Sequence, residues 1–464
     1  MKKTNLLVKA LLVTLCLTMV LQLAACGGNG GGGETPAGPQ RVEGLLFEER
    51  TVEDANMDLL IFWSPKSDIQ EINALYYKKY GGKVKIIEKQ WDAKTSTISS
   101  YVAAGTPCEV VLLATNDVPT MAASGLLDEI PMDKLDKNSK YFNFDLMNSD
   151  FTYKDKVYAI NYNDTTGTRF IPFVYNAKLF KKYGVKTPYE HFKAGNWDFD
   201  QFRKTAAEMT MDTDDDGFVD LFGFDANLVV FGSFFSSNAV QPVKYHDNKY
   251  SLNLEDSRVL ECYQLYSDMF NIDKSMNQSE FKYYQNFLNE RSAMVQVSID
   301  SYAQFYLDGM AKGSAELCLF PSGPAANGKY FASDAGHTSV ASVKGTNNMD
   351  ATLAWAECAI SVWLELGQDS PRETLNYYWN EDEKARIAEF NEAVVPFAET
   401  GLKHNSEGVH GVNFPTANWI TAQSIMSDIR RNTSVQTVIE RYKPTLQTQL
   451  DNVNAILAGT AVAQ

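Results

Sequence analysis

Short apolar runs alternate with stretches of helical spacing through the first part of the chain. The runs Asp58–Trp63, Lys83–Glu88 and Glu109–Ala114 have strand character, while Ser67–Tyr80 and Thr95–Ala104 repeat apolar residues at helical intervals. Short apolar strands separated by helices are typical of a sheet with parallel strands and helices on its faces. The pattern predicts an α/β fold.

The chain changes character after Tyr158. This second region runs from Phe170–Tyr175 through Phe202–Met209 to a long helical zone at Ser257–Phe270. Apolar spacing predicts further helices toward the C-terminus, over Thr352–Leu366, Glu381–Val394, Trp419–Asn432 and Val435–Leu457.

The first 26 residues have the pattern of an export signal. Two lysines precede an apolar stretch that ends in the sequence LAAC at Cys26. This ending resembles the lipobox of bacterial lipoproteins, in which a diacylglyceryl group joins the cysteine and cleavage occurs just before it. We therefore predict a signal peptide over residues 1–25, and a lipidated Cys26 with a Gly-rich tether over 26–56. Localisation follows as the extracytoplasmic face of the bacterial cell membrane; an uncleaved membrane anchor is the alternative.

Composition narrows the classes of partner. The 464 residues include 58 acidic and 42 basic side chains, which gives a formal charge of −16. This charge argues against nucleic acid as a binding partner, because binding to phosphates depends on Lys and Arg. The length predicts two or three domains with their own cores. Beyond the signal, four cysteines show no CxxC spacing, so disulfides and free buried thiols both stay open for Cys108, Cys262, Cys318 and Cys358.

Several segments in a fixed order carry a family resemblance. They are the turn Ser124–Glu129, the strand Val157–Ile160, the strand and helix start Val174–Phe180, the helix start Gly195–Phe202, the strand Arg291–Met294 and the C-terminal stretch Trp419–Leu457. Together they resemble the extracellular solute-binding proteins of ABC importers, family 1, in the sugar-binding branch that is maltose-binding-protein-like.

The resemblance implies a two-lobed periplasmic-binding-protein fold of type II, with the ligand cleft between lobes that are joined by hinge strands. Lobe 1 would comprise residues 57–163 and 336–368, and lobe 2 residues 164–335 and 369–464. The chain would cross between the lobes near residues 160–168, 330–338 and 366–372. Such a protein captures a small solute, closes over it and presents it to a membrane permease.

Sugars present hydroxyl edges and apolar C–H faces, so sugar sites combine Trp or Tyr platforms with polar side chains. The resemblance and this chemistry predict a ligand-binding set of Trp63, Lys66, Asn116, Asp117, Asn161, Tyr162, Asp300, Tyr302 and Trp419. Three alternatives stay open. Trp63 and Trp419 would otherwise pack in a core, Asn116-Asp117 would otherwise cap the next helix, and the segment after Asn161 would otherwise be a plain loop.

The chain departs from the family after Met294, where a Gly and a Trp are usual. Ser298-Ile299-Asp300-Ser301-Tyr302 stands there instead, so we expect Tyr302 to replace the missing platform. Trp355 and Trp363 lie at helical apolar spacing and are predicted to be core residues.

An aspartate-rich segment provides a candidate metal loop. Asp212, Asp214, Asp216 and Asp220 match D-x-D-x-D-G-x-x-D, the first nine positions of an EF-hand loop, but the twelfth position is Gly223 instead of Glu. A structural calcium ion and a solvated acidic turn are the two interpretations. We predict no other cofactor.

No motif for catalysis appears: the five His residues form no HExxH, and there is no GxSxG or P-loop sequence. We predict no catalytic residues and no enzyme. The expected protein is a monomeric substrate-binding lipoprotein that takes a mono- or oligosaccharide to ABC permease membrane subunits. A lipid-anchored carbohydrate-active enzyme and a binding protein for another solute, such as a peptide, are the alternatives.

Overall fold

The computed structural model describes residues 44–62, 67–90, 93–106, 108–114, 117–162, 170, 173–226, 230–246, 249–277, 282–297, 299–331, 338–366, 379, 381–395 and 419–461. The predicted signal peptide, Cys26 and the three predicted crossings lie wholly or largely outside these ranges. Among the helices described, none is both long enough and apolar enough to cross a membrane.

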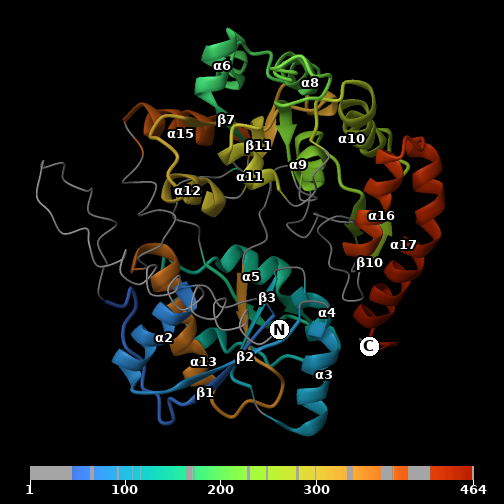
Figure 1. The fold of residues 1–464 in the computed structure, drawn as a ribbon. Helices are drawn as coiled ribbons and strands as arrows, with labels where there is room; N and C mark the ends of the chain where they lie inside the picture. Colours follow the sequence, from blue (N-terminus) through green and yellow to red (C-terminus); the bar gives the residue numbers. More distant parts are fainter. Residues whose placement is uncertain are drawn as a thin grey trace, which may run out of the picture. The chain divides into compact units, whose positions relative to one another are not determined.

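The first sheet has the strand order β2-β1-β3-β14-β6 (Figure 1). Its strands are β1 (Met57–Ile61), β2 (Val84–Glu88), β3 (Val110–Ala114), β6 (Ala159–Ile160) and β14 (Thr338–Ala341). Strands β1, β2 and β3 are parallel, as the sequence pattern predicts. The sheet as a whole is mixed, because β14 runs antiparallel to both β3 and β6.

Helices cover this sheet and complete the first core. They are α2 (Ser67–Tyr80), α3 (Lys94–Ala104), α4 (Val118–Ala123), η3 (Met132–Lys134), α5 (Phe144–Asp150), α13 (Met349–Ser361) and the π-helical η6 (Val362–Leu366). A small hairpin adds β4 (Thr152–Tyr153) and β5 (Lys156–Val157). The core side chains come mainly from residues 57–160 and 340–364. Trp355 is fully buried, as predicted, and Trp363 is partly buried.

Residues 44–56 pack on the first core, although the sequence suggested that they belong to the tether. The Phe47 ring lies 5.0 Å from that of Phe142 between centroids. Arg50 forms an ion pair of 2.6 Å with Glu357, and the backbone N–H of Leu46 donates to the Ser361 hydroxyl. The Gly-rich composition up to Gln40 gave no sign that the following segment packs on the core.

The second sheet has the order β12-β7-β11-β8. Its strands are β7 (Phe173–Asn176), β8 (Phe222–Asp225), β11 (Ser292–Gln296) and β12 (Ala315–Cys318). Strand β7 is antiparallel to both β11 and β12, whereas β8 is parallel to β11. The core around this sheet is rich in aromatic rings; Phe173 stacks on Phe224 at 5.7 Å between centroids.

The helices around the second sheet are α6 (Ala177–Tyr183), α7 (Pro188–Lys193), α8 (Phe199–Glu208), α9 (Val230–Ser237), α10 (Ser257–Ser267), the π-helical η4 (Asp268–Ile272), α11 (Tyr283–Leu288), α12 (Ile299–Leu307), η5 (Pro324–Ala326) and α15 (Glu381–Ala393). Short strand pairs join β9 (Val243–His246) with β10 (Lys249–Leu252) and β13 (Tyr330–Phe331) with β15 (Val394–Val395). The second core draws on residues 170–320 and 379–453.

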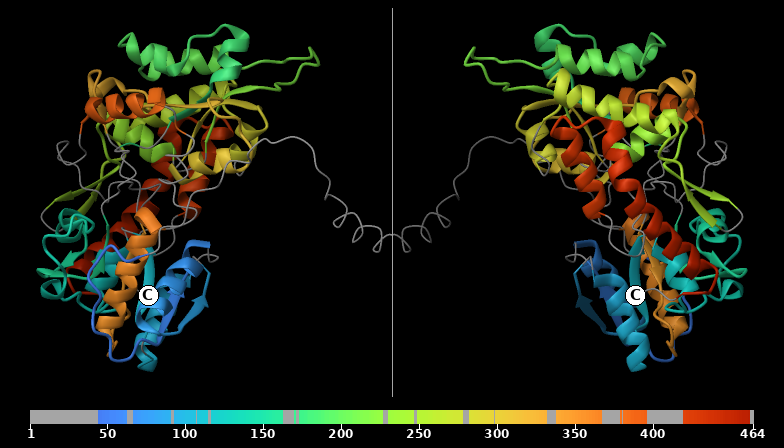
Figure 2. Two further views of the ribbon diagram at one scale, coloured as in Figure 1. Left: turned by 90° about the vertical axis from the view of Figure 1, so that its left-hand side faces the viewer. Right: turned by 90° about the vertical axis from the view of Figure 1, so that its right-hand side faces the viewer.

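The two C-terminal helices, α16 (Trp419–Arg430) and α17 (Val435–Leu457), lie side by side in both views of Figure 2. Asp428 of α16 accepts a hydrogen bond from the Tyr442 hydroxyl of α17. Most buried residues of α17 belong to the second core, but Ile456 near its end belongs to the first.

The four cysteines that sequence analysis left open are free thiols, and all four are buried. Each side chain is surrounded by apolar residues of one of the two cores. They therefore act as small core residues in this structure.

Candidate functional site

One edge of the first sheet gathers three of the nine predicted ligand residues, Asp117, Asn161 and Tyr162. Because β6 runs in the same direction as β1 and β3, the carboxyl ends of these three strands and the start of β14 meet at one edge. Ligands of open α/β sheets bind beyond such an edge. Asp117 and Asn161 follow β3 and β6 there, whereas Trp63, Lys66 and Asn116 lie outside the described residues.

Asp117 is occupied by a partner from within the chain. Its carboxylate accepts from the Lys94 ammonium at 2.5 Å and from the backbone N–H of Ala114 at 3.2 Å, and its side chain is 1% exposed. Burial raises the pKa of Asp117 and lowers the pKa of Lys94, and each partner opposes the shift of the other. The pair closes the turn between β3 and α4, so Asp117 shapes this edge and does not face outward from it.

Asn161 and Tyr162 lie where β6 ends. The Asn161 side chain is buried and donates to the Ser339 hydroxyl at 3.0 Å. Tyr162 is partly exposed, and its ring lies 5.4 Å from the ring of Trp363 between centroids. Trp363, which the sequence pattern placed in the core, thus shares an aromatic surface with a predicted ligand residue.

The second sheet has an equivalent edge, formed by the carboxyl ends of β8, β11 and β12 and the start of β7. Asp225 ends β8 and is 1% exposed. Its carboxylate accepts from the Asn286 side chain at 2.8 Å. Burial raises the pKa of Asp225 to about 6, and the hydrogen bonds from Asn286 and the Ala226 N–H limit the rise.

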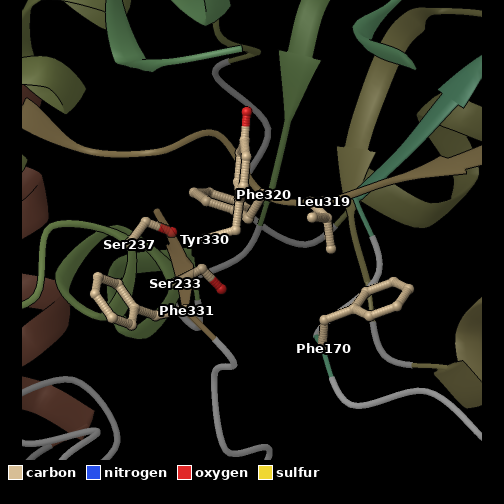
Figure 3. Close-up of a pocket in the computed structure, with 7 residues that line it drawn as sticks. All are labelled: Phe170, Ser233, Ser237, Leu319, Phe320, Tyr330 and Phe331. Atoms are coloured by element: carbon tan, nitrogen blue, oxygen red, sulfur yellow. The ribbon is translucent and has the colours of Figure 1, made fainter. Parts of the chain in front are cut away.

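A pocket opens at the same edge (Figure 3). It is lined by Phe170 before β7, Leu319 and Phe320 after β12, Tyr330 and Phe331 of β13, and two serines of α9, Ser233 and Ser237. The serines lie four residues apart, which places them on one face of the helix. Sequence analysis missed this pocket; the available signal was a pair of serines at helical spacing within the apolar run VVFGSFFSS.

Ser233 is a buried polar residue in the lining of this pocket. It is 1% exposed, and among the described residues its hydroxyl oxygen has no hydrogen-bond partner. In Figure 3 the hydroxyl points toward the side of the pocket where Leu319 and Phe170 lie. A buried hydroxyl without a partner costs free energy, so a polar group of a ligand would be stabilised at this point.

Hydrogen bonds fix the walls of the pocket. The indole N–H of Trp197 donates to the Leu319 carbonyl at 2.8 Å, and the Tyr330 hydroxyl donates to the Trp197 carbonyl at 3.1 Å. The N–H of Gly323 donates to the Ser237 carbonyl. A side chain at Gly323 would collide with Asn238, because a Cβ there would lie 2.7 Å from the Asn238 Cα.

Three predicted ligand residues, Asp300, Tyr302 and Trp419, belong to the second part of the chain. Tyr302 of α12 is fully buried, and its hydroxyl bonds with that of Tyr306 and with the Ala315 carbonyl. The expectation that Tyr302 replaces a platform therefore has no support in this conformation, since core side chains cover the ring. Asp300 and Trp419 lie in α12 and α16, but their side chains are outside the described part of the chain.

The aspartate-rich loop brings three of its four carboxylates together. One oxygen each of Asp212, Asp214 and Asp216 lies within 4.8 Å of the others. Asp220 is exposed and is not among these three; its carboxylate accepts from the backbone N–H of Thr213 at 2.8 Å and from the Thr213 hydroxyl. These hydrogen bonds lower the pKa of Asp220. The loop thus offers oxygen ligands of the kind that calcium prefers.

Comparison with known proteins decides the family. Residues 71–361, more than half of the chain, match the sequence model of the family described as bacterial extracellular solute-binding protein. The chain belongs to this family. No curated protein matches the sequence.

Solved structures of similar fold include sugar-binding proteins in complex with their ligands. The galacto-N-biose/lacto-N-biose I-binding protein from Bifidobacterium longum, in complex with lacto-N-biose, gives a TM-score of 0.64 at 12% identity, over 87% of this chain and 99% of that one. MalE from Bdellovibrio bacteriovorus, bound to maltotriose, gives 0.62 at 14% identity over 85% and 100%. Lmo0181 from Listeria monocytogenes, in complex with cycloalternan, gives 0.60 at 13% over 88% and 100%.

At sequence identities this low, the similarity shows that the fold is shared. This solute-binding protein has the two-lobed periplasmic-binding-protein architecture, which agrees with the fold predicted from sequence. In such α/β architectures ligands bind beyond the carboxyl ends of the strands, and these ends form the two sheet edges described above.

Proposed function

We infer that this solute-binding protein captures a mono- or oligosaccharide and delivers it to the membrane permease of an ABC importer. The observation that carries this proposal is the pocket at the edge of the second sheet. It combines aromatic and aliphatic walls with serine hydroxyls, and none of the described residues that line it is charged. Apolar walls with serine hydroxyls suit an uncharged substituent of a neutral sugar, which presents both C–H and O–H groups.

The comparisons support the same ligand class. The similar structures named above were solved with lacto-N-biose, maltotriose and cycloalternan. A charged ligand such as a peptide would need partners for its terminal amine and carboxylate. Neither the described lining of the pocket nor the paired Asp117 provides them.

Capture by hinge closure requires that the sugar bind the closed form more tightly than the open form, since a ligand shifts a conformational equilibrium only by this difference. The partly exposed Tyr162 on the first sheet edge and Trp419 at the start of α16 would provide stacking surfaces. Micromolar affinity needs about −8 kcal/mol, which a few such contacts can supply.

The proposal includes a lipid anchor at Cys26. Two acyl chains hold a protein stably at a membrane where one holds it only marginally. The Gly-rich segment after Cys26 would keep the binding domains near the permease while they move freely.

A further proposal concerns calcium. The three converging carboxylates of Asp212, Asp214 and Asp216 would bind one ion and stabilise the turn that leads from α8 to β8. This role is structural and lies outside the sugar pocket.

The experiment that tests the function is binding of sugars to the exported chain with Cys26→Ser, which removes the lipid. Saturable binding of one sugar class, with the sugar recovered unchanged, supports a transport receptor. Product formation would favour the carbohydrate-active enzyme. Binding of peptides without binding of sugars would contradict the proposal.

A further inference from the structure

The pocket beside Ser233 is too small for a whole sugar ring. Its enclosed space holds about one group of the size of a water molecule. Hydrogen bonds with Trp197 and Gly323 hold Leu319, Tyr330 and Ser237 of its lining in place. Any ligand must therefore insert a single small substituent and leave the rest of the molecule outside.

The chemical character of the pocket lining limits which small substituent can bind there. A carboxylate or ammonium group would have no counter-ion among the described residues of the lining, because none of them is charged. A methyl group would fit the apolar walls but would leave the Ser233 hydroxyl without a partner. An acetamido group has four heavy atoms and exceeds the space. A primary alcohol satisfies both features, since its hydroxyl fills the space and pairs with Ser233 while its CH₂ packs against the rings beside it.

We propose that the Ser233 pocket is a subsite for one primary alcohol, the CH₂OH substituent of a hexose unit. This inference rests on the proposed function, because it names the part of the sugar that binds in the same pocket. Sites built to pair with a ligand hydroxyl discriminate strongly against analogues that lack it, because the buried protein group is then left unpaired.

The state of Ser233 predicts an unusual pair of effects for one substitution. Ser233→Ala removes a buried hydroxyl that has no partner, so the ligand-free protein should melt at the same temperature or a few degrees higher. The same substitution should weaken sugar binding by about tenfold or more. Loss of binding together with retained or increased stability separates a ligand contact from a residue needed for folding.

The first test measures both effects with the sugar that binds best among glucose, galactose, mannose, maltose and lactose. Ser236→Ala is the matched control, because Ser236 lies in the same helix at low exposure but outside the pocket lining. We expect the control to bind as the unchanged protein does. Equal affinity of Ser233→Ala and the unchanged protein would overturn the inference.

The second test compares each hexose with its 6-deoxy analogue and with the pentose that lacks the whole substituent, for example glucose, 6-deoxyglucose and xylose. The unchanged protein should bind the hexose about tenfold or more tightly than the other two, and Ser233→Ala should remove the preference over the 6-deoxy sugar. If 6-deoxy sugars bind equally well, only this inference fails. If no sugar of the panel binds, the proposed function fails, and the subsite assignment with it.

Discussion

The two sheet edges bury one carboxylate each, but they stabilise it by different means. At the first edge Asp117 has an ammonium partner, Lys94, at 2.5 Å. At the second edge Asp225 has an amide partner, Asn286, at 2.8 Å and a backbone N–H. Both side chains are 1% exposed, so the difference lies in the charge of the partner and not in the depth of burial.

This difference in partner determines how each edge responds to mutation and to a change of pH. A buried ion pair depends on both partners, because the loss of one leaves an uncompensated charge. At Asp225 burial raises the pKa to about 6, and the neutral donors offset only part of this rise, so the carboxylate can take up a proton. The first edge is therefore sensitive to mutation and the second edge to pH.

The largest effect is expected from breaking the ion pair. Asp117→Ala should lower the free energy of unfolding by about 3–5 kcal/mol, because it removes the carboxylate that pairs with the buried Lys94 ammonium at 2.5 Å. Denaturant unfolding followed by circular dichroism measures the loss. The double variant Lys94→Met, Asp117→Leu should recover most of it. A double variant as unstable as the single one would show that the pair matters through its geometry and not through its charge.

Asp225→Asn should act in the opposite direction at neutral pH. The native state holds Asp225 with a pKa of about 6, whereas its ordinary value is 3.8. Between about pH 4 and 6 the native state thus binds more protons at this site than the unfolded state, so its contribution to stability falls as pH rises through that window.

The amide carries no charge at any pH, and so Asp225→Asn should raise stability at pH 7 by up to about 3 kcal/mol and have little effect at pH 4. Unfolding curves at both pH values test this, with the exposed Asp200→Asn as control. A gain of equal size at both pH values would exclude titration of Asp225 as the cause.

A smaller effect, on binding only, is expected at Trp419. Trp419→Ala should weaken sugar binding at least tenfold, about 1.4 kcal/mol, while the ligand-free protein melts nearly as before. Isothermal titration and a melting curve measure the two quantities. A large fall in melting temperature with unchanged affinity would instead place Trp419 in the core.

The smallest effect is expected at the aspartate loop, which belongs to neither edge. Calcium should raise the melting temperature by a few degrees, and Asp212→Asn with Asp214→Asn should abolish this rise without changing sugar affinity. Asp200→Asn again provides the control. An identical calcium response in the double variant would leave the loop as a solvated acidic turn.

The sequence was sufficient to predict most helices and strands, because the spacing of their apolar residues is regular. Helices Ser67–Tyr80 and Val435–Leu457 have the bounds that the pattern predicts. The antiparallel placement of β14 was not predictable from its own four residues, since strand direction depends on a connection far along the chain. The docking of Arg50 on Glu357 likewise depends on partners 307 residues apart.

The site was less predictable than the fold. Residues expected beside a ligand because of their chemistry, such as Asp117 and Tyr302, find partners inside the chain. Whether a polar side chain faces a ligand or another residue depends on tertiary contacts that a single sequence does not display. Ser233 shows the converse case, in which an ordinary residue becomes informative because its hydroxyl has no partner.

The most direct test of the central claim is a thermal-shift screen of the exported chain with Cys26→Ser against mono-, di- and oligosaccharides, with peptides as the contrasting class. A sugar present at 100 times its dissociation constant should stabilise the protein by about 2.7 kcal/mol. We predict such a shift with one class of sugar, which is recovered unchanged. A shift with peptides and with no sugar would contradict the account.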